Sequence, residues 1–456
     1  MRLTPKSDDY ITTGSIWKGI LTYCIPIMIG SLFQQLYNMV DTIVVGNFVG
    51  TDALAAVGGS AGEVAGITMW FFMGISSGAT VTVAQHFGAK NFQGVHRDIH
   101  NGYALAIIGG AILTTVGMIV SRPLMTVMRT DSSLMHDSLV YLRILFAGLI
   151  PSIIFNIGSG ILRALGDSVR PLYYLISCCL INIAGDLLLV LVFPLGVAGV
   201  AIATITAQTI SAFLVTRRIM KLDDTYRLQP RKIRVYPEVM KVQLKIGIPG
   251  GFQSALFGIA NMTIQSFINT LGKTTVAAFG AYRKIDALFW MVSGALGNSA
   301  TTFVGQNYGA GSMPRVKESI KTTLGMHAIA SLAVSALVVL LRVPLFRIFT
   351  NDPAVIEVGS KIALGMSSFY ITYTLMEVLS SSLRGLGIVG IPTALTLGGI
   401  CVLRILFITI FMPIYHSVNV VIIVYPLSWG VTSLLFVIYY LARRKKFLRL
   451  PSGART

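Results

Sequence analysis

The chain has few charged residues and few of the residues that most often build catalytic and metal centres. Asp, Glu, Lys and Arg make up 12% of its 456 residues, about half the usual share in a soluble globular domain. Its 4 cysteines and 6 histidines lack the spacing of a zinc site or a disulfide framework. It also lacks a GxxxxGK[ST] phosphate-binding loop. We therefore expect no enzymatic activity, no cofactor and no ATP hydrolysis.

Long apolar segments dominate what is present. Hydrophobic residues make up 54% of the chain, and the apolar segments approach or exceed the ~20 residues that span a bilayer as a helix. The sequence predicts an all-α polytopic membrane protein with twelve spans, at about 16–46, 53–84, 97–120, 136–161, 171–193, 196–216, 242–270, 280–304, 319–341, 359–383, 393–413 and 419–441.

The two halves of the chain repeat one another. Ile25-Pro26 recurs as Ile248-Pro249, and Leu162-Arg163 recurs as Leu383-Arg384, at nearly the same offset. Six spans per half keep both halves in one orientation, so they are parallel repeats of the kind found in transporters. We expect an N-terminal lobe at 1–216, a basic linker at 217–241 and a C-terminal lobe at 242–456, with six helices in each lobe.

The net charge of +18 is distributed as in a membrane protein. Lys and Arg concentrate in the N-terminus, the 217–241 linker and the tail that follows the last span. Because basic residues stay on the cytoplasmic side during insertion, both termini and the linker are predicted to be cytoplasmic. Basic clusters there favour contact with anionic lipids over binding of nucleic acid. Asp8 and Asp9 interrupt the N-terminus, so we expect no cleavable signal peptide.

Ionisable residues inside membrane helices are rare and usually functional. Helical rise places Asp41 and Asp186 each about 10 Å from the outer end of its span. Thr204 and Glu63 are expected at similar depths, about 12 and 15 Å down. Asn182 lies four residues before Asp186, so both side chains leave one face of the helix. These residues predict one polar layer in the outer half of the N-terminal lobe.

The first span carries a polar stripe made of Gln34, Asn38 and Asp41, with Pro26 in the same helix. A proline removes one backbone hydrogen bond and promotes a kink, so Pro26 is a candidate hinge. Oxygen-rich clusters suit a hard cation, and paired carboxylates can instead hold a proton. The residues leave H⁺ and Na⁺ both open as the coupling ion, and no other metal is expected.

The C-terminal half has lost this charge pattern. Ile264 stands at the position that matches Asp41, and a neutral stripe of Gln253, Asn261 and Gln265 remains. Glu377 could either form a structural pair with Arg384 or contact substrate. Asp286 follows Arg283 and Lys284, which favours helix capping or a local ion pair over function. Together with Gln34, Asn38 and Glu63, we take Gln253, Asn261, Gln265 and Glu377 as candidate substrate-pathway residues.

These motifs, in this order, resemble the multidrug and toxic compound extrusion (MATE) family of prokaryotic type. The resemblance covers about Trp17 to Tyr440 and rests on residues 38–41, 85–89, 162–167, 182–186 and 196–201. It implies antiport of mostly cationic amphipathic compounds against H⁺ or Na⁺. The family's cation site falls on Asp41, Asn182, Asp186 and Thr204. It further implies a monomer in the cell membrane of a bacterium or archaeon.

One branch of that family couples through acids in the seventh and tenth spans. The seventh-span acid is absent here, and Glu377 stands at a different position relative to Leu383-Arg384-Gly385. The main alternative is a flippase for lipid-linked precursors from the same superfamily. Such a carrier should have a cationic cavity, whereas Arg143 and Arg404 are the only basic residues expected within spans. An uncoupled channel and a membrane enzyme are the remaining alternatives.

Overall fold

The structure is a computed structural model that describes residues 10–447. Every regular element in this part of the chain is a helix. Eight helices are long and apolar enough to cross a membrane, or up to ten if each of two bent pairs forms one span. The other two expected spans are α10 (Pro237–Asn269) and α11 (Lys273–Gly309), of 33 and 37 residues. The predicted all-α membrane fold is confirmed.

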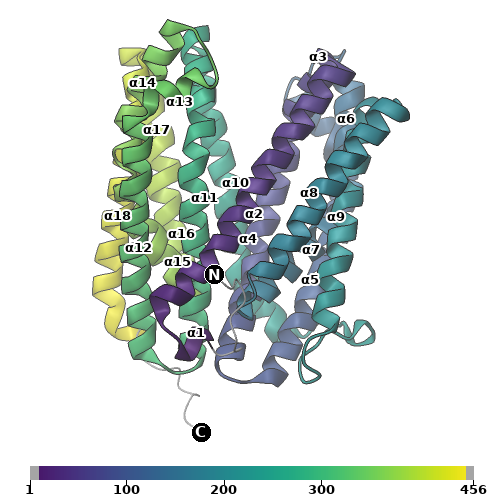
Figure 1. The fold of residues 1–456 in the computed structure, drawn as a ribbon, viewed down its shortest axis with the longest axis vertical. Coiled ribbons are helices and arrows are strands. Elements are labelled where there is room, and N and C mark those ends of the chain that lie inside the picture. The colour runs from purple at the N-terminus through teal and green to yellow at the C-terminus, as the bar shows by residue number, and fades with distance from the viewer. Residues whose placement is uncertain (1–9, 448–456) are drawn as a thin grey trace. The chain divides into compact units, whose positions relative to one another are not determined.

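Residues 25–251 form the first of two compact units. Its core lies between α4, α5 and α7, where Ile99, Ile157 and Ile161 are fully buried or nearly so. The adjacent pair α8 and α9 packs beside α7 (Figure 1). The helices of this unit are most of α2 (Ile16–Val44), α3 (Thr51–Gly58), α4 (Ser60–Gly88), α5 (Phe92–Val127), α6 (Met135–Ala147), α7 (Leu149–Ala164), α8 (Val169–Leu187) and α9 (Gly196–Met220).

Residues 10–24 and 252–447 form the second unit. Here α11 packs against α12, α14 and α15, and α15 packs against α18. An aromatic cluster with Phe289, Tyr370 and Trp429 fills the space among these helices. The further helices are α1 (Tyr10–Thr13), α12 (Met313–Leu340), α13 (Arg342–Arg347), α14 (Pro353–Ser367), α15 (Tyr370–Gly385), α16 (Gly390–Thr396), α17 (Leu403–Tyr415) and α18 (Val418–Phe447).

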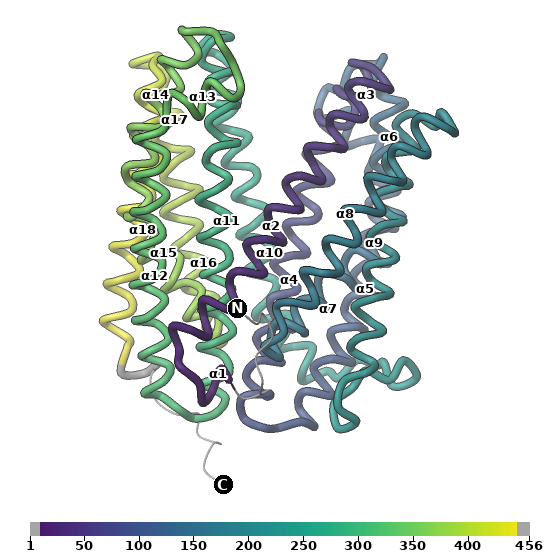
Figure 2. Tube along the Cα trace, viewed as in Figure 1, coloured from purple at the N-terminus to yellow at the C-terminus, as the bar shows by residue number. Residues whose placement is uncertain are grey.

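Two helices change unit part of the way along their length. The first turns of α2 belong with the second unit as far as residue 24, and the remainder belongs with the first. Conversely, α10 belongs with the first unit as far as residue 251 and with the second from residue 252. The changes fall beside Pro26 and Pro249, which the sequence repeat makes equivalent. Both helices can be followed along the trace in Figure 2.

The segment between α9 and α10 is folded onto the first unit. Tyr226 packs against Phe87 and Phe92, and Leu228 is 1% exposed. The hydroxyl and backbone N–H of Thr225 both donate to the Asp223 carboxylate, and these bonds lower the pKa of that exposed group. This segment is therefore an ordered, docked connection. The termini that the sequence places in the cytoplasm, 1–9 and 448–456, lie outside the described residues.

Candidate ion-binding site

Three helices of the first unit bring together the residues that helical depth and spacing had selected. Asp41 lies near the end of α2, Asn182 and Asp186 lie on α8, and Thr204 lies on α9. Both carboxylate-bearing helices continue into a π-helical turn, Val45–Val49 after Asp41 and Leu188–Val192 after Asp186. Such turns widen a helix locally and are frequent at functional sites.

The two carboxyl groups are neighbours. Those of Asp41 and Asp186 lie close enough to interact electrostatically with each other. Asn182 Nδ2 donates to Thr204 Oγ1 over 3.4 Å, and Thr204 Oγ1 in turn donates to the carbonyl of Val200. Tyr37 on α2 interacts with both Asp41 and Thr204 and so links the two pairs into one cluster.

The cluster is largely buried, with Asp41 half-buried, and it is incompletely paired. Asn182 and Asp186 are fully buried, and Thr204 is 9% exposed. Among the described residues, no hydrogen-bond donor reaches Asp41 Oδ1, Asn182 Oδ1 or either Asp186 carboxylate oxygen. Buried polar atoms are nearly always satisfied, so this set of free oxygens suits an added cationic partner.

Electrostatics restricts what that partner can be. Two unit charges about 4 Å apart repel by about 4 kcal/mol at an effective dielectric constant near 20. A shared proton or a monovalent cation removes this repulsion. In the described part of the chain, no group of three or more His, Cys, Asp or Glu side chains could hold a metal ion. Oxygen donors from two carboxylates, an amide and a hydroxyl fit H⁺ or Na⁺.

Two tyrosines complete the surroundings of the cluster and were missed by the sequence analysis. Tyr37 interacts with both Asp41 and Thr204, and Tyr141 on α6 lies close enough to interact electrostatically with both carboxylates. Tyr37 lies four residues before Asp41, so i,i+4 spacing could have identified it. No comparable signal marks Tyr141, because α6 is separated from the other three helices in the sequence.

The remaining N-terminal candidates lie outside this connected cluster. Gln34 and Asn38 are exposed on α2, and Glu63 is exposed in the first turn of α4. Gly59 interrupts the helix just before that turn, so Glu63 lies near a helix N-terminus, which favours a nearby negative charge. The Glu63 side chain has no hydrogen-bond or ion-pair partner among the described residues. Its position is therefore compatible with either a helix-end role or a substrate contact.

In the second unit, the Glu377 carboxylate is hydrogen-bonded to side chains of its own helix, α15, and lies beside Gly297 on α11. Its carboxylate accepts hydrogen bonds from Tyr373 and Ser381, at 2.8 and 3.0 Å. An ion pair with Arg384 does not form among the described residues. Gln253 and Gln265 are half-buried and Asn261 is exposed on α10, where Gln265 donates to Asn269.

Asp286 corrects an expectation from the sequence. It lies well inside α11, which begins at Lys273, so it does not cap a helix. Its carboxylate accepts from the hydroxyl of Tyr370 and from the indole N–H of Trp290. Aromatic donors thus replace the expected capping or local ion pair. Because α11 begins at Lys273, before the predicted span start at 280, Arg283 and Lys284 also lie inside the helix.

The Glu377 site gives a steric prediction. A Cβ at Gly297 would lie 2.2 Å from Glu377 Oε1, whereas one at Gly294 would meet nothing within 4 Å. Gly297→Ala should therefore displace the carboxylate and destabilise the protein by about 1–3 kcal/mol, as overpacking usually does. Thermal unfolding of purified protein measures this change. Gly294→Ala is the control, and equal melting temperatures for the two variants would contradict the placement of Glu377.

Comparison with known proteins agrees with the fold and with the duplication. The MatE family model matches twice, over residues 26–188 and 249–410. The two matches begin at the equivalent prolines, Pro26 and Pro249. Together they cover well over half of the chain.

Curated relatives align along most of the chain. A probable multidrug resistance protein, YoeA of Bacillus subtilis, is 26% identical, with 96% of each chain covered. A probable multidrug resistance protein, NorM of Thermotoga maritima, is 27% identical over 82% of this chain and 80% of the relative. An FAD transporter of Shewanella oneidensis is 25% identical over 76% and 77%.

Solved structures share the same fold. A multidrug resistance MATE family transporter of the MOP superfamily, described in an outward-facing conformation, superposes with a TM-score of 0.89 at 23% identity, covering 97% of this chain and 99% of the other. A MOP superfamily transporter from Pyrococcus furiosus gives 0.88 at 23% identity, covering 98% and 99%. With two matched family domains, a helical membrane fold and relatives that are transporters rather than enzymes, the chain belongs to the MATE family of multidrug efflux transporters.

Proposed function

We propose that this protein is a secondary active antiporter that exports organic, mainly cationic amphipathic compounds in exchange for H⁺ or Na⁺. The observation that carries the proposal is the proximity of the Asp41 and Asp186 carboxyl groups, of whose four oxygens Asp41 Oδ1 and both Asp186 oxygens are buried without a donor among the described residues. Such a pair changes its net charge when an ion enters or leaves. That change can be coupled to a conformational equilibrium.

The coupling follows from where the charge lies. When the site is empty, two negative charges repel each other across the α2–α8 contact and attract a cationic substrate. Entry of a proton or Na⁺ removes the repulsion and allows Asp41 and Asp186 to approach. Because α2 also contains Pro26, which lacks the N–H needed for a helical hydrogen bond, the helix can bend there and alter the space available to substrate.

Substrate contacts are assigned to polar groups outside the ion site. We propose Gln34, Asn38 and Glu63 in the first unit, since all three are exposed on α2 and α4. In the second unit we propose Glu377, with Gln253, Asn261 and Gln265 on α10. Carboxylates at Glu63 and Glu377 favour organic cations and disfavour a pyrophosphate-linked lipid, which argues against the flippase alternative.

The protein is proposed to act as a monomer in a prokaryotic cell membrane, with no role in binding nucleic acid. Both termini and the 217–241 segment then face the cytoplasm, where the basic side chains can contact anionic lipids. The proposed lobes follow the repeat, at 1–216 and 242–456. No cofactor is required by the chemistry of the ion site.

Sidedness can be tested at the linker. Thr225 is exposed in the turn that follows α9. A single cysteine at this position, with the native cysteines replaced, should resist an impermeant maleimide in intact cells and react after lysis. A control cysteine at Asp131, exposed in the turn after α5, should react in intact cells. The reverse pattern would invert the assigned topology.

The transport proposal is tested by ethidium efflux from proteoliposomes with the proton and sodium gradients imposed separately. At least one gradient should drive ethidium against its concentration. Ethidium movement that only follows its own gradient under both conditions would identify a facilitator instead of an antiporter.

A further inference from the structure

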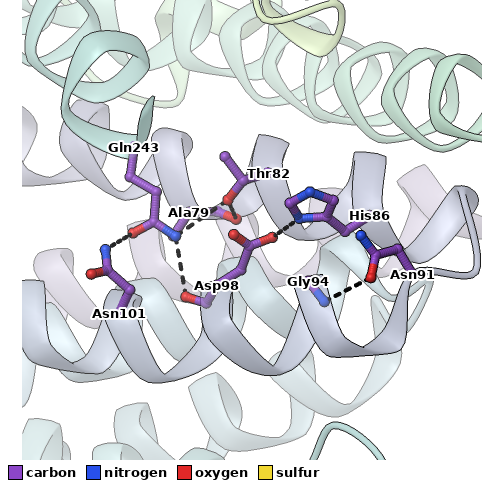
Figure 3. Close-up of polar contacts among 8 residues, drawn as sticks. All are labelled: Ala79, Thr82, His86, Asn91, Gly94, Asp98, Asn101 and Gln243. Carbon is purple, nitrogen blue, oxygen red and sulfur yellow. Dashed lines mark hydrogen bonds and ion pairs between the residues drawn. The ribbon is translucent and has the colours of Figure 1, made fainter. Parts of the chain in front are cut away.

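A polar side chain near the start of α10, that of Gln243, is buried. Gln243 is fully buried, although it lies only six residues from the first residue of the helix. It inserts between α4 and α5 of the first unit, as Figure 3 shows. Burial of an amide is unfavourable unless its polar atoms are hydrogen-bonded.

Every polar atom of this amide has a partner. Gln243 Nε2 donates to Thr82 Oγ1 at 3.2 Å and to the carbonyl of Asp98 at 3.1 Å. Its Oε1 accepts from Asn101 Nδ2 at 2.9 Å. Asn101 Oδ1 in turn accepts from the backbone N–H of Tyr236. A fully satisfied buried network of this kind selects one arrangement of its helices.

The receiving side of the network is fixed independently of α10. His86 Nδ1 on α4 and Asp98 Oδ2 on α5 are 2.6 Å apart, which ties the two helices together (Figure 3). Asp98 is fully buried, and its backbone carbonyl is the one that Gln243 contacts. Gln243 therefore enters a site that α4 and α5 already form between themselves.

Beyond the network, α10 touches α4 mainly through backbone. A Cβ at Gly78 would lie 2.1 Å from the Gln243 carbonyl oxygen, and one at Gly74 would lie 2.3 Å from the Gly251 nitrogen. Between residues 237 and 251, the only buried apolar side chain is Ile246. Met240 and Leu244 also pack, half-buried, against the core of the first unit, so the contact combines a small apolar part with hydrogen bonds that water can replace when it opens.

The equivalent segment of the other repeat is held in a similar way in the second unit. Arg315 Nη2 donates to the carbonyls of Ile11 and Gly14, and Asn307 Nδ2 donates to the first of these. The repeat makes Asn307 the counterpart of His86. In both halves, therefore, polar contacts hold the chain at or just before the start of a helix that later changes unit.

We propose that Gln243, Thr82, Asn101 and the Asp98 carbonyl form a latch that holds the first half of α10 in one transport conformation and releases it in the other. The proposal rests on the alternating-access function above. Because α10 is one unbroken helix whose second half belongs to the other unit, movement of the units strains it near Pro249. The contact of α10 with α4 and α5 can open and re-form, because hydrogen bonds and close glycine backbone make up much of it. Gln243 is then a positioning residue that sets the balance between conformations.

The first test measures opening without substrate or ion gradient. A cysteine replaces Ile246, which is 4% exposed, in a background without the native cysteines. Maleimide labelling of the purified protein in detergent should be slow. Gln243→Leu and Gly78→Ala should each accelerate labelling about 10-fold, the effect expected when one or two net hydrogen bonds are lost. Gly66→Ala is the control on α4, since a Cβ there meets nothing within 4 Å.

The second test asks whether opening is needed for transport. Thr82→Cys with Gln243→Cys, bridged by a short reversible bifunctional thiol reagent, should abolish ethidium efflux, and reduction should restore it. The matched control is a disulfide between Ala79→Cys and Gly102→Cys, whose Cβ atoms would be 3.4 Å apart between α4 and α5. This bond should leave efflux unchanged.

Two results would overturn the latch. One is unchanged Ile246→Cys labelling in both Gln243→Leu and Gly78→Ala. The other is bridged protein that transports as fast as the reduced form. Failure of the proposed antiport is separately visible, because it would abolish gradient dependence in the proteoliposomes and leave the labelling rates of the latch variants unaffected.

Discussion

Asp41→Asn is expected to lower coupled efflux at least about 10-fold, equivalent to about 1.4 kcal/mol in the barrier to transport, while the protein still folds and inserts. The substitution keeps the size of the side chain and removes one of two neighbouring like charges. An ion can then no longer neutralise the pair. Rates of ethidium efflux from proteoliposomes, normalised to the amount of inserted protein, measure the effect.

The control for this variant makes the same chemical change elsewhere in the unit. Asp52 is an exposed carboxylate in the first turn of α3, and Asp52→Asn should leave efflux close to wild type. Efflux by Asp41→Asn at the wild-type rate under the same gradient would show that the Asp41–Asp186 pair does not carry the coupling ion.

Substrate affinity is expected to depend on the coupling ion, and this is the second large effect. If the pair binds a proton when substrate leaves, lowering the pH should weaken binding of an organic cation, by at most about 10-fold per pH unit for one proton. If it binds Na⁺, rising Na⁺ should weaken binding at constant pH. Fluorescence titration of purified protein with ethidium distinguishes the two ions.

Asp186→Asn should flatten whichever dependence the wild type shows. In the wild type, proton-driven efflux should slow when the external pH is raised, since the inward proton gradient is lost. Linkage requires that bound substrate weaken ion binding by the same factor by which the bound ion weakens substrate binding. Wild-type affinity that stays constant across both titrations would exclude this cluster as the coupling site and leave the second unit as its location.

The ion cluster could be anticipated because its signals are local. Depth follows from helical rise, and the i,i+4 spacing of Asn182 and Asp186 sets a shared face. Thr204 and Asp41 lie on other helices, so their place in the cluster depends on packing among α2, α8 and α9. Their similar depth in the membrane was enough to predict it. Tyr141 gave no such signal, because an aromatic residue in an apolar helix is ordinary.

Features that depend on tertiary contacts were not accessible from the sequence. A helical period predicts that α10 is a helix, but it does not show that Gln243 is buried between α4 and α5. Nor does the basic composition of 217–241 show that this segment docks through Tyr226 and Leu228. Asp286 was misassigned because Arg283 and Lys284 were read as the start of a helix, whereas both lie inside α11.

The most direct test counts the ions that leave when substrate binds. Saturating ethidium is added to purified protein in weakly buffered solution, and released protons are measured with and without Na⁺; released Na⁺ is measured with a sodium electrode. The proposed coupling site predicts release of protons or Na⁺ from the wild type and none from the Asp41→Asn, Asp186→Asn double variant. Equal release from both proteins, or no release from the wild type under either condition, would contradict it.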